Sequence, residues 1–198
     1  MRTNEGSVLI AKAIILLASI VMVIIRAPHG RRRRGIALVR SRKGNLEFVL
    51  LTFAWLSFFL PLIWIATPLL APADYSLHPL PLFAGTVCFT AGLWLFHLAH
   101  ADLGPNWSIT LEVLEQHRLV TRGVYRRVRH PMYAALLLYS VGQALVLPNY
   151  VAGLSSGVAM VLLVGLRIGP EERMMVEEFG NDYRGYMTAT KRLVPGIW

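Results

Sequence analysis

Residues 132–166 read MYAALLLYSVGQALVLPNYVAGLSSGVAMVLLVGL, two apolar runs separated only by Pro148 and Asn149. Proline and asparagine are typical turn residues. Each run, 132–147 and 150–166, is slightly short for a helix that crosses a bilayer core of about 30 Å, which takes about 20 residues. The pattern predicts a tight helical hairpin in a membrane, one end of which can sit in the headgroup region.

The rest of the chain is apolar enough to hold further membrane helices. Of its 198 residues, 55% are hydrophobic and 16% are charged, whereas about a quarter of an average soluble chain is charged. Residues 8–25, 46–70 and 80–99 form longer apolar runs, and a chain that crosses lipid must satisfy its peptide groups within a helix. We therefore expect an all-α polytopic membrane protein with about five transmembrane helices and a cytoplasmic C-terminal helical segment, forming one domain over residues 1–198.

Lysine and arginine are distributed unevenly along the chain. Residues 26–45 contain eight of them, residues 100–131 contain five, and the tail from residue 167 contains five more, whereas the connections 71–79 and 148–149 contain none. Because short loops rich in Lys and Arg stay in the cytoplasm, the three basic regions should share the cytoplasmic side. Five helices alternate consistently with this division. The N-terminus is thus predicted outside the cytoplasm and the C-terminus inside it.

The first apolar run could be read as a cleaved signal peptide. However, it is longer than the hydrophobic core of a usual signal peptide and ends directly in basic residues, which favours a membrane helix. The four arginines at 31–34 have no aromatic interleaving or nucleic-acid module beside them, so no nucleic-acid partner is predicted. A single cysteine, Cys88, excludes an intramolecular disulfide. His97 and His100 have no identifiable third ligand, so we interpret them as interfacial and predict no metal site.

Polar residues gather in two segments, 103–133 and 167–195, which flank the predicted hairpin. Because a hairpin returns the chain to its starting side, Pro131 and Arg167 should be neighbours in space, and the two segments can share one pocket on the cytoplasmic side. Proline suits the first turn of a helix, which puts His130 at the helix entrance, where backbone amides attract an anion. Taken alone, a basic cluster that ends in proline before an apolar run is more typical of a topology anchor than of a binding site.

Arg167 and Glu171 are four residues apart, so on a helix they face the same side and can form an ion pair. The same charges after an apolar helix can instead bind a zwitterion with an amine and a carboxylate. Pro170 between them predicts a disrupted hydrogen-bond ladder near Arg167. Four tyrosines either line such a pocket or belong to an interfacial aromatic belt: Tyr125, Tyr133, Tyr183 and Tyr186.

The two polar segments, taken in order, resemble the isoprenylcysteine carboxyl methyltransferase family over about half of the chain. The features that carry the resemblance are Leu103 and Gly104, Trp107 and Ser108, the stretch 117–125, the Arg-His-Pro-Met-Tyr box at 129–133, the stretch 167–172, Phe179 and Gly180 with Tyr183 and Tyr186, and the stretch 192–195. The first two apolar runs carry no motif of this family. For these two runs we therefore predict membrane helices and no part of the family's site.

The resemblance implies S-adenosylmethionine-dependent methyl transfer at the membrane, with an isoprenylcysteine-like or other lipophilic carboxylate as acceptor. The positions that surround the cofactor in the family are matched by His117, Arg118, Leu119, Val120, Tyr125, His130, Pro131, Met132 and Tyr133, and a further cofactor contact is matched by Glu171. Arg167 matches a position beside the reacting carboxylate and is the expected catalytic residue. One more cofactor contact aligns with Glu112, Glu115 or Gln116.

Other functions stay open at this point. The same cofactor can methylate a phospholipid amine or a small thiol, because acceptor choice depends on the lipid-facing gap between helices, which no motif reports. A pocket that opens sideways between helices would admit a water-soluble cofactor and a lipophilic or prenylated substrate by different routes. A non-catalytic membrane scaffold or transport component is the alternative from another class, since most charged residues have a topological explanation. The two polar segments carry the family's motifs in the family's order, which favours the enzyme.

Overall fold

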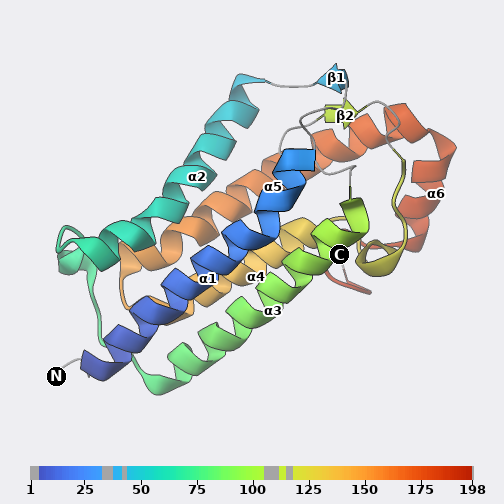
Figure 1. Cartoon of the computed structure of the whole chain (residues 1–198). Helices are drawn as coiled ribbons and strands as arrows, with labels where there is room; N and C mark the ends of the chain where they lie inside the picture. The colour runs from blue at the N-terminus through green and yellow to red at the C-terminus, as the bar shows by residue number, and fades with distance from the viewer. Residues whose placement is uncertain (1–4, 33–37, 42–43, 105–111, 115–117, 198) are drawn as a thin grey trace.

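The computed structural model describes residues 5–32, 38–41, 44–104, 112–114 and 118–197. Within these residues the chain is a bundle of helices whose long axes run roughly side by side (Figure 1). The helices are α1 (Glu5–Arg32), α2 (Asn45–Ala66), α3 (Pro79–Leu103), α4 (Pro131–Val146), α5 (Tyr150–Phe179) and α6 (Asn181–Ala189). Two short strands, β1 (Leu38–Ser41) and β2 (Glu112–Leu114), and two 3₁₀ turns, η2 (Ala71–Ala73) and η4 (Gly123–Arg126), complete the described elements.

The all-α polytopic fold is confirmed, and a helix occupies each of the five predicted apolar runs. Helices α1, α2, α3 and α5 are long and apolar enough to cross a membrane, whereas α4 is a shorter apolar helix. Large hydrophobic side chains on α1 and α2, such as Leu17 and Phe48, are exposed. Such faces suit contact with lipid, and the chain is an integral membrane protein.

Several helix ends differ from the predicted limits. Helix α1 runs to Arg32 instead of residue 25, and α3 runs to Leu103 instead of residue 99. Helix α2 ends at Ala66 instead of residue 70, because Thr67 is extended and precedes a proline, which disfavours the helical conformation at the residue before it. Helix α5 runs to Phe179 instead of residue 166 and passes through Pro170 without ending. Pro170 still removes one donor from the hydrogen-bond ladder, and packed neighbouring helices can satisfy the group that this frees.

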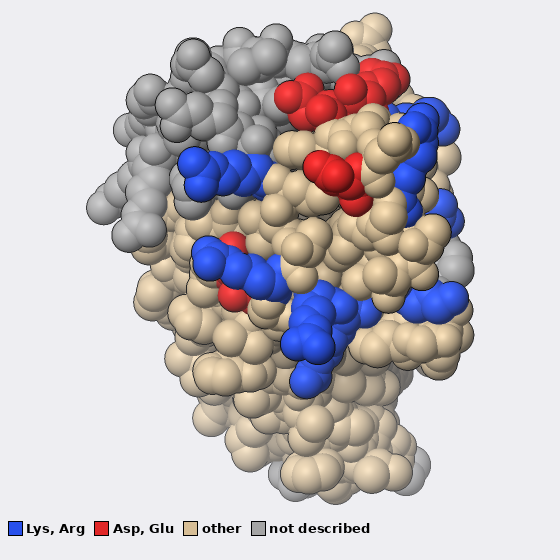
Figure 2. Space-filling model, turned by 90° about the vertical axis from the view of Figure 1, so that its right-hand side faces the viewer, with Lys and Arg blue, Asp and Glu red and all other residues tan. Residues whose placement is uncertain are grey.

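The connections between helices gather at the two ends of the bundle as the charge pattern predicts. Strand β1 pairs with β2 in antiparallel fashion, which joins the first two basic regions, and Val128 bridges to Lys191, which joins the second to the tail. At the opposite end, Asp74 bridges to Asn149 and so joins the two connections that lack basic residues. Figure 2 shows the basic end, across which Lys and Arg side chains are spread.

The hairpin packs closely on α3 through glycines. A Cβ added at Gly85 would lie 2.9 Å from the backbone oxygen of Gly142 and 2.6 Å from a methyl group of Val146. A Cβ at Gly92 would lie 3.1 Å from the backbone oxygen of Ala135. Small residues of this kind let two membrane helices approach each other closely. Helices α3 and α4 thereby form the most extensive helix contact of the described bundle, while α1 packs mainly on α3 and α2 packs mainly on α5.

We predict that Gly85→Ala destabilises the protein, because the new methyl group overlaps backbone atoms of α4, and overpacking costs about 1–3 kcal/mol. Gly157→Ala on α5 is the matched control, since a Cβ there meets nothing within 4 Å and alanine favours a helix by about 1 kcal/mol over glycine. Thermal unfolding in detergent should therefore give a lower Tm for the first variant and an equal or higher one for the second. Equal Tm values for the two variants would contradict the tight contact.

Candidate active site

The start of α4 lies against the middle of α5, so the two polar segments meet. The Tyr133 hydroxyl donates to Glu171 Oε2 at 2.5 Å, and His130 Nδ1 lies 3.8 Å from Glu171 Oε1. The rings of His130 and Tyr133 stack with centroids 5.6 Å apart. Pro131 is the first residue of α4, as predicted, and is fully buried. The hairpin thus brings the segment that ends at Tyr133 against the one that begins at Arg167.

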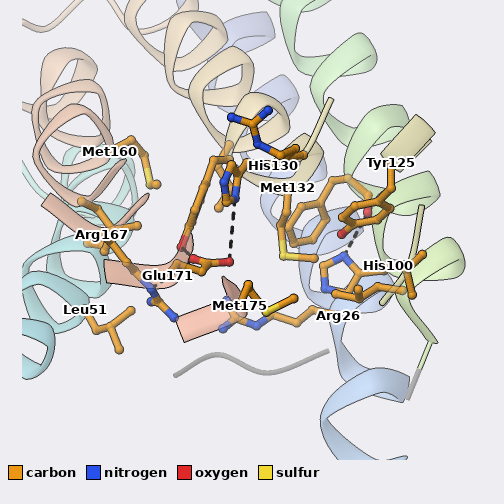
Figure 3. A pocket seen from close by; sticks show the side chains of 18 of the residues that line it. Arg26, Leu51, His100, Tyr125, His130, Met132, Met160, Arg167, Glu171 and Met175 are labelled. Atoms are coloured by element: carbon orange, nitrogen blue, oxygen red, sulfur yellow. Dashed lines mark hydrogen bonds and ion pairs between the residues drawn. The ribbon is translucent and has the colours of Figure 1, made fainter. Parts of the chain in front are cut away.

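A cavity of about 270 Å³ lies where these segments meet (Figure 3). Small-molecule sites typically enclose roughly 300–1,000 Å³. The predicted site residues that line it are Arg118, Leu119, Val120, Tyr125, His130, Met132, Tyr133, Arg167 and Glu171. Of the other predicted residues, Pro131 sets the start of α4 without lining the cavity, and His117 lies outside the described residues, as do Glu115 and Gln116.

The segment before α4 is anchored on the end of α3. The backbone N–H of Val124 donates to Asp102 Oδ2 at 2.8 Å, and Gly123 adopts a φ of 59°. A side chain at Gly123 would be strained and would also clash with the Asp102 carboxylate. This turn directs Tyr125, two residues later, into the cavity.

Glu172 on α5 connects the start of α4 and the C-terminal tail to α5. Its buried carboxylate lies 2.9 Å from Arg129 Nε, 3.3 Å from His130 Nε2 and 2.8 Å from Arg192 Nη2. The hydrogen bonds to Glu172 raise the pKa of the Arg192 guanidinium. The backbone N–H groups of Arg129 and His130 donate to the carbonyls of Lys191 and Arg192, and the Arg129 side chain donates to carbonyls near the end of α6. The C-terminal tail is therefore fixed beside the cavity.

The two tail tyrosines belong to the cavity and not to an exposed aromatic belt. Tyr183 and Tyr186 are buried and line it, and the Tyr186 hydroxyl donates to the backbone oxygen of Tyr125 at 2.5 Å. Burial raises the pKa of Tyr186 to about 12 and also raises the pKa of Tyr125 and Tyr183. All three phenols are therefore neutral at physiological pH.

Arg167 contacts carboxylates on two helices. Its Nε lies 3.9 Å from Glu171 Oε2 on the same helix, and its Nη2 lies 3.4 Å from Glu47 Oε1 on α2. The intrahelical pair that the spacing indicated is present, but it is the longer of the two. Glu47 was not among the predicted site residues. Its only distinguishing feature in the sequence is that it is an acidic residue near the start of an apolar run.

Helices α1, α2 and α3 supply a further part of the wall, which the motifs in the sequence did not indicate. This wall is formed by Met22, Val23, Arg26, Leu51, Ala54, Trp55, Phe58, Phe96, His100 and Leu103. Figure 3 shows Arg167, Leu51 and Met160 toward one side of the cavity and Arg26, His100 and Tyr125 toward the other, with His130 and Glu171 between them. The cavity therefore joins all five long helices.

The interfacial interpretation of His100 was wrong. Its side chain is completely buried, and its Nδ1 is hydrogen-bonded to the carbonyl of Phe96 at 2.9 Å. His97 is exposed and contacts the ring of Trp94. The two histidines thus lie in different environments although they are three residues apart. Among the described residues, no three His, Cys, Asp or Glu side chains are grouped as a metal site would require.

A helical bundle with spanning helices and one polar cavity at its basic end defines an integral membrane protein with an intramembrane or interfacial site. A sequence model of the isoprenylcysteine carboxyl methyltransferase (ICMT) family matches residues 84–177 of the chain. The matched region covers α3, α4 and most of α5 and leaves out α1 and α2.

Similar proteins carry the same family name. A protein-S-isoprenylcysteine O-methyltransferase of Dictyostelium discoideum is 29% identical over 117 residues, which cover 58% of this chain and 49% of that protein. Protein-S-isoprenylcysteine O-methyltransferase A of Arabidopsis thaliana is 37% identical over 89 residues, 45% of each chain. This chain spans about half the length of these relatives. A probable protein-S-isoprenylcysteine O-methyltransferase of Oryza sativa subsp. japonica matches over the full length of both chains at 28% identity.

A solved structure shares the fold. It is that of a eukaryotic intramembrane Ras methyltransferase, isoprenylcysteine carboxyl methyltransferase, with a TM-score of 0.54 and 25% sequence identity. The likeness covers 78% of this chain and 54% of that one. The chain therefore shares its overall helical fold with a known membrane methyltransferase.

We predict that Glu172→Gln strongly destabilises the protein, because it leaves buried Arg129 without its charged partner, which costs about 3 kcal/mol or more. For a chain of this size that corresponds to a fall in Tm of roughly 6–12 °C. Glu178→Gln, an exposed neighbour on the same helix, is the control and should leave Tm unchanged. A Tm for Glu172→Gln that equals the control value would show that the Glu172 contacts contribute little.

Proposed function

We propose that this protein transfers a methyl group from S-adenosylmethionine to the carboxylate of an S-prenylated cysteine or a closely related lipophilic acid. One observation carries the proposal: a single cavity contains His130, Tyr133 and Glu171, which match cofactor positions, together with Arg167, which matches an acceptor position. The O-methyltransferase activity in the names of the relatives supports it.

The side chains around the cavity fit the chemical groups of S-adenosylmethionine. Glu171 offers a carboxylate to the ammonium group, and Arg118 offers a guanidinium to the carboxylate. The aromatic and apolar residues suit the adenine ring. The set that would hold the cofactor is Arg118, Leu119, Val120, Tyr125, His130, Met132, Tyr133 and Glu171, to which His117 is added from the sequence, and Pro131 fixes the helix start that presents them.

The chain's task in such a reaction is mainly positioning. The bound cofactor supplies an electrophilic methyl group on a sulfonium, and an acceptor carboxylate is already ionised at neutral pH. Arg167 would hold that carboxylate through its guanidinium fork and direct one oxygen toward the methyl group. The Tyr133 hydroxyl, which donates to Glu171, keeps the Glu171 carboxylate oriented. Met132 and Met160 help to exclude water from the cavity.

A lipophilic acceptor would reach the cavity between α1 and α2. Helix α1 packs mainly on α3, whereas α2 packs mainly on α5, and both supply apolar side chains to the cavity wall. The Arg26 guanidinium lies over the Trp55 ring, 5.5 Å from its centroid, and so links the two helices beside the cavity.

The spread of Lys and Arg at this end (Figure 2) supports a cytoplasmic position for the cavity and the C-terminus, with the N-terminus outside.

The acceptor is tested by incubating the purified protein in lipid vesicles with S-adenosylmethionine labelled in its methyl group. S-farnesylcysteine with a free carboxylate is the main substrate, its carboxamide is the matched control, and phosphatidylethanolamine and a small alkyl thiol are the other arms. We expect label in a base-labile methyl ester of the free acid alone. Label found only in the phospholipid or the thiol would overturn the acceptor. A folded protein that neither binds nor uses the cofactor would overturn the whole proposal.

We predict that Arg167→Ala lowers turnover far more than cofactor affinity. A hydrogen-bonded charged contact contributes about 1.5–3 kcal/mol, so kcat/KM for the acceptor should fall roughly 10- to 100-fold while the Kd for S-adenosylmethionine, measured by calorimetry, changes less than about threefold. Glu171→Gln should show the reverse, with weaker cofactor binding as its main effect. If Arg167→Ala weakens the cofactor instead, Arg167 does not hold the acceptor.

A further inference from the structure

Glu47 is a buried carboxylate on a helix that carries no family motif. It is the sole acidic residue of α2, and its side chain is 9% exposed. The exposed neighbours Leu46 and Phe48 face outward as lipid-contacting residues do. Burial of a carboxylate in such a helix is costly unless a partner compensates it. A functional or structural reason for Glu47 must therefore lie in what it contacts.

That contact is Arg167, the expected acceptor-binding residue. Glu47 Oε1 lies 3.4 Å from Nη2, while Glu171 Oε2 lies 3.9 Å from Nε. Two different nitrogen atoms of one planar group are thus approached from two helices. Because a guanidinium is rigid and planar, contacts at two of its atoms restrict both its position and its tilt.

The helix that carries Glu47 is itself fixed on α5. Leu50, one turn along α2, packs in a core cluster with Leu163 and Val164. Farther along, the Ser155 hydroxyl donates to the backbone oxygen of Ser57 at 3.3 Å. Leu51, on the turn between these contacts, lines the cavity. The position of Glu47 relative to Arg167 is therefore set by the packing of α2 on α5.

From this geometry we infer that Glu47 is a positioning residue, which holds the Arg167 guanidinium in the orientation that directs an acceptor carboxylate. The inference rests on the proposed function and extends the active site to α2, outside the region that the family model matches. Glu47 acts through Arg167 and does not touch the acceptor. Its negative charge also opposes an incoming carboxylate, so removal of the charge should not weaken acceptor binding.

The test is the kinetics of Glu47→Gln in the labelled-ester assay. We expect kcat to fall roughly 10- to 100-fold, since misplacement of a reacting group by about 1 Å has effects of this size. The KM for the acceptor should stay the same or decrease, and the Kd for S-adenosylmethionine should be unchanged. A loss of packing alone would not give this combination. A kcat within twofold of wild type in the folded variant would overturn the inference.

Asp74→Asn is the matched control, because it makes the same change at a carboxylate whose partners are structural. Asp74 accepts hydrogen bonds from Trp64 Nε1 and Asn149 Nδ2 at the opposite end of the bundle. This variant should lower Tm and leave the kcat of the folded protein unchanged. An equal loss of kcat in both variants would show that Glu47 affects activity only through the stability of the protein, and would overturn its positioning role.

Coupling to Arg167 provides the second measurement. In an Arg167→Lys background, Glu47→Gln should have little further effect on kcat, because the planar group that Glu47 orients is already gone. Independent, additive losses would overturn the inference.

If Glu47→Gln does not fold, a second variant tests the same point. Glu47→Asp keeps the negative charge but withdraws it from Arg167 by one methylene. It should lose kcat, and full activity would overturn the positioning role. A wild-type protein that forms no ester overturns the proposed function and this inference with it, whereas an active wild type with an unaffected Glu47→Gln overturns the inference alone.

Discussion

A charged side chain that is buried must find its partner within the protein, because an unpaired charge in a protein interior is costly. This constraint explains how the cavity is assembled. Glu172 satisfies it with Arg129 and Arg192, and Arg167 satisfies it with carboxylates on α2 and α5. The pairings of Glu172 with Arg129 and of Arg167 with Glu47 join segments that are distant in sequence. The polar residues that give the cavity its chemistry therefore also hold its walls together.

Glu171 and Glu172 show how neighbours on one helix serve different purposes. Successive residues on a helix point about 100° apart, so Glu172 faces the start of α4 and the tail, while Glu171 faces the cavity and accepts from Tyr133. Such a division depends on a helix that continues past Pro170. Had α5 ended at residue 166, the chain after it would have had no fixed rotation that directs the two carboxylates apart.

Much of this architecture follows from the sequence, and the rest follows from contacts that a sequence does not display. The lengths of the apolar runs predict five helices, and the Lys and Arg distribution predicts which connections share an end. The pocket residues from 118 to 133 and from 167 to 171 follow from ordered motifs. Glu47 and His100 do not, because their roles arise from which helix packs on which, and a single polar residue in an apolar run does not say what it faces.

The cavity has two unlike halves, and the difference has a physical consequence. Many of the motif residues sit on α4 and α5; α4 packs on α3 with glycines at the contact, and α5 packs on α4, so this framework is closely packed. The apolar wall that faces them comes from α1 and α2, which pack mainly on different partners and touch each other little. A seam of this kind can separate without breaking the framework, because the two helices share few contacts that separation would lose. The closely packed half therefore suits a cofactor of fixed shape, and the separable half suits a long apolar group that arrives from the bilayer.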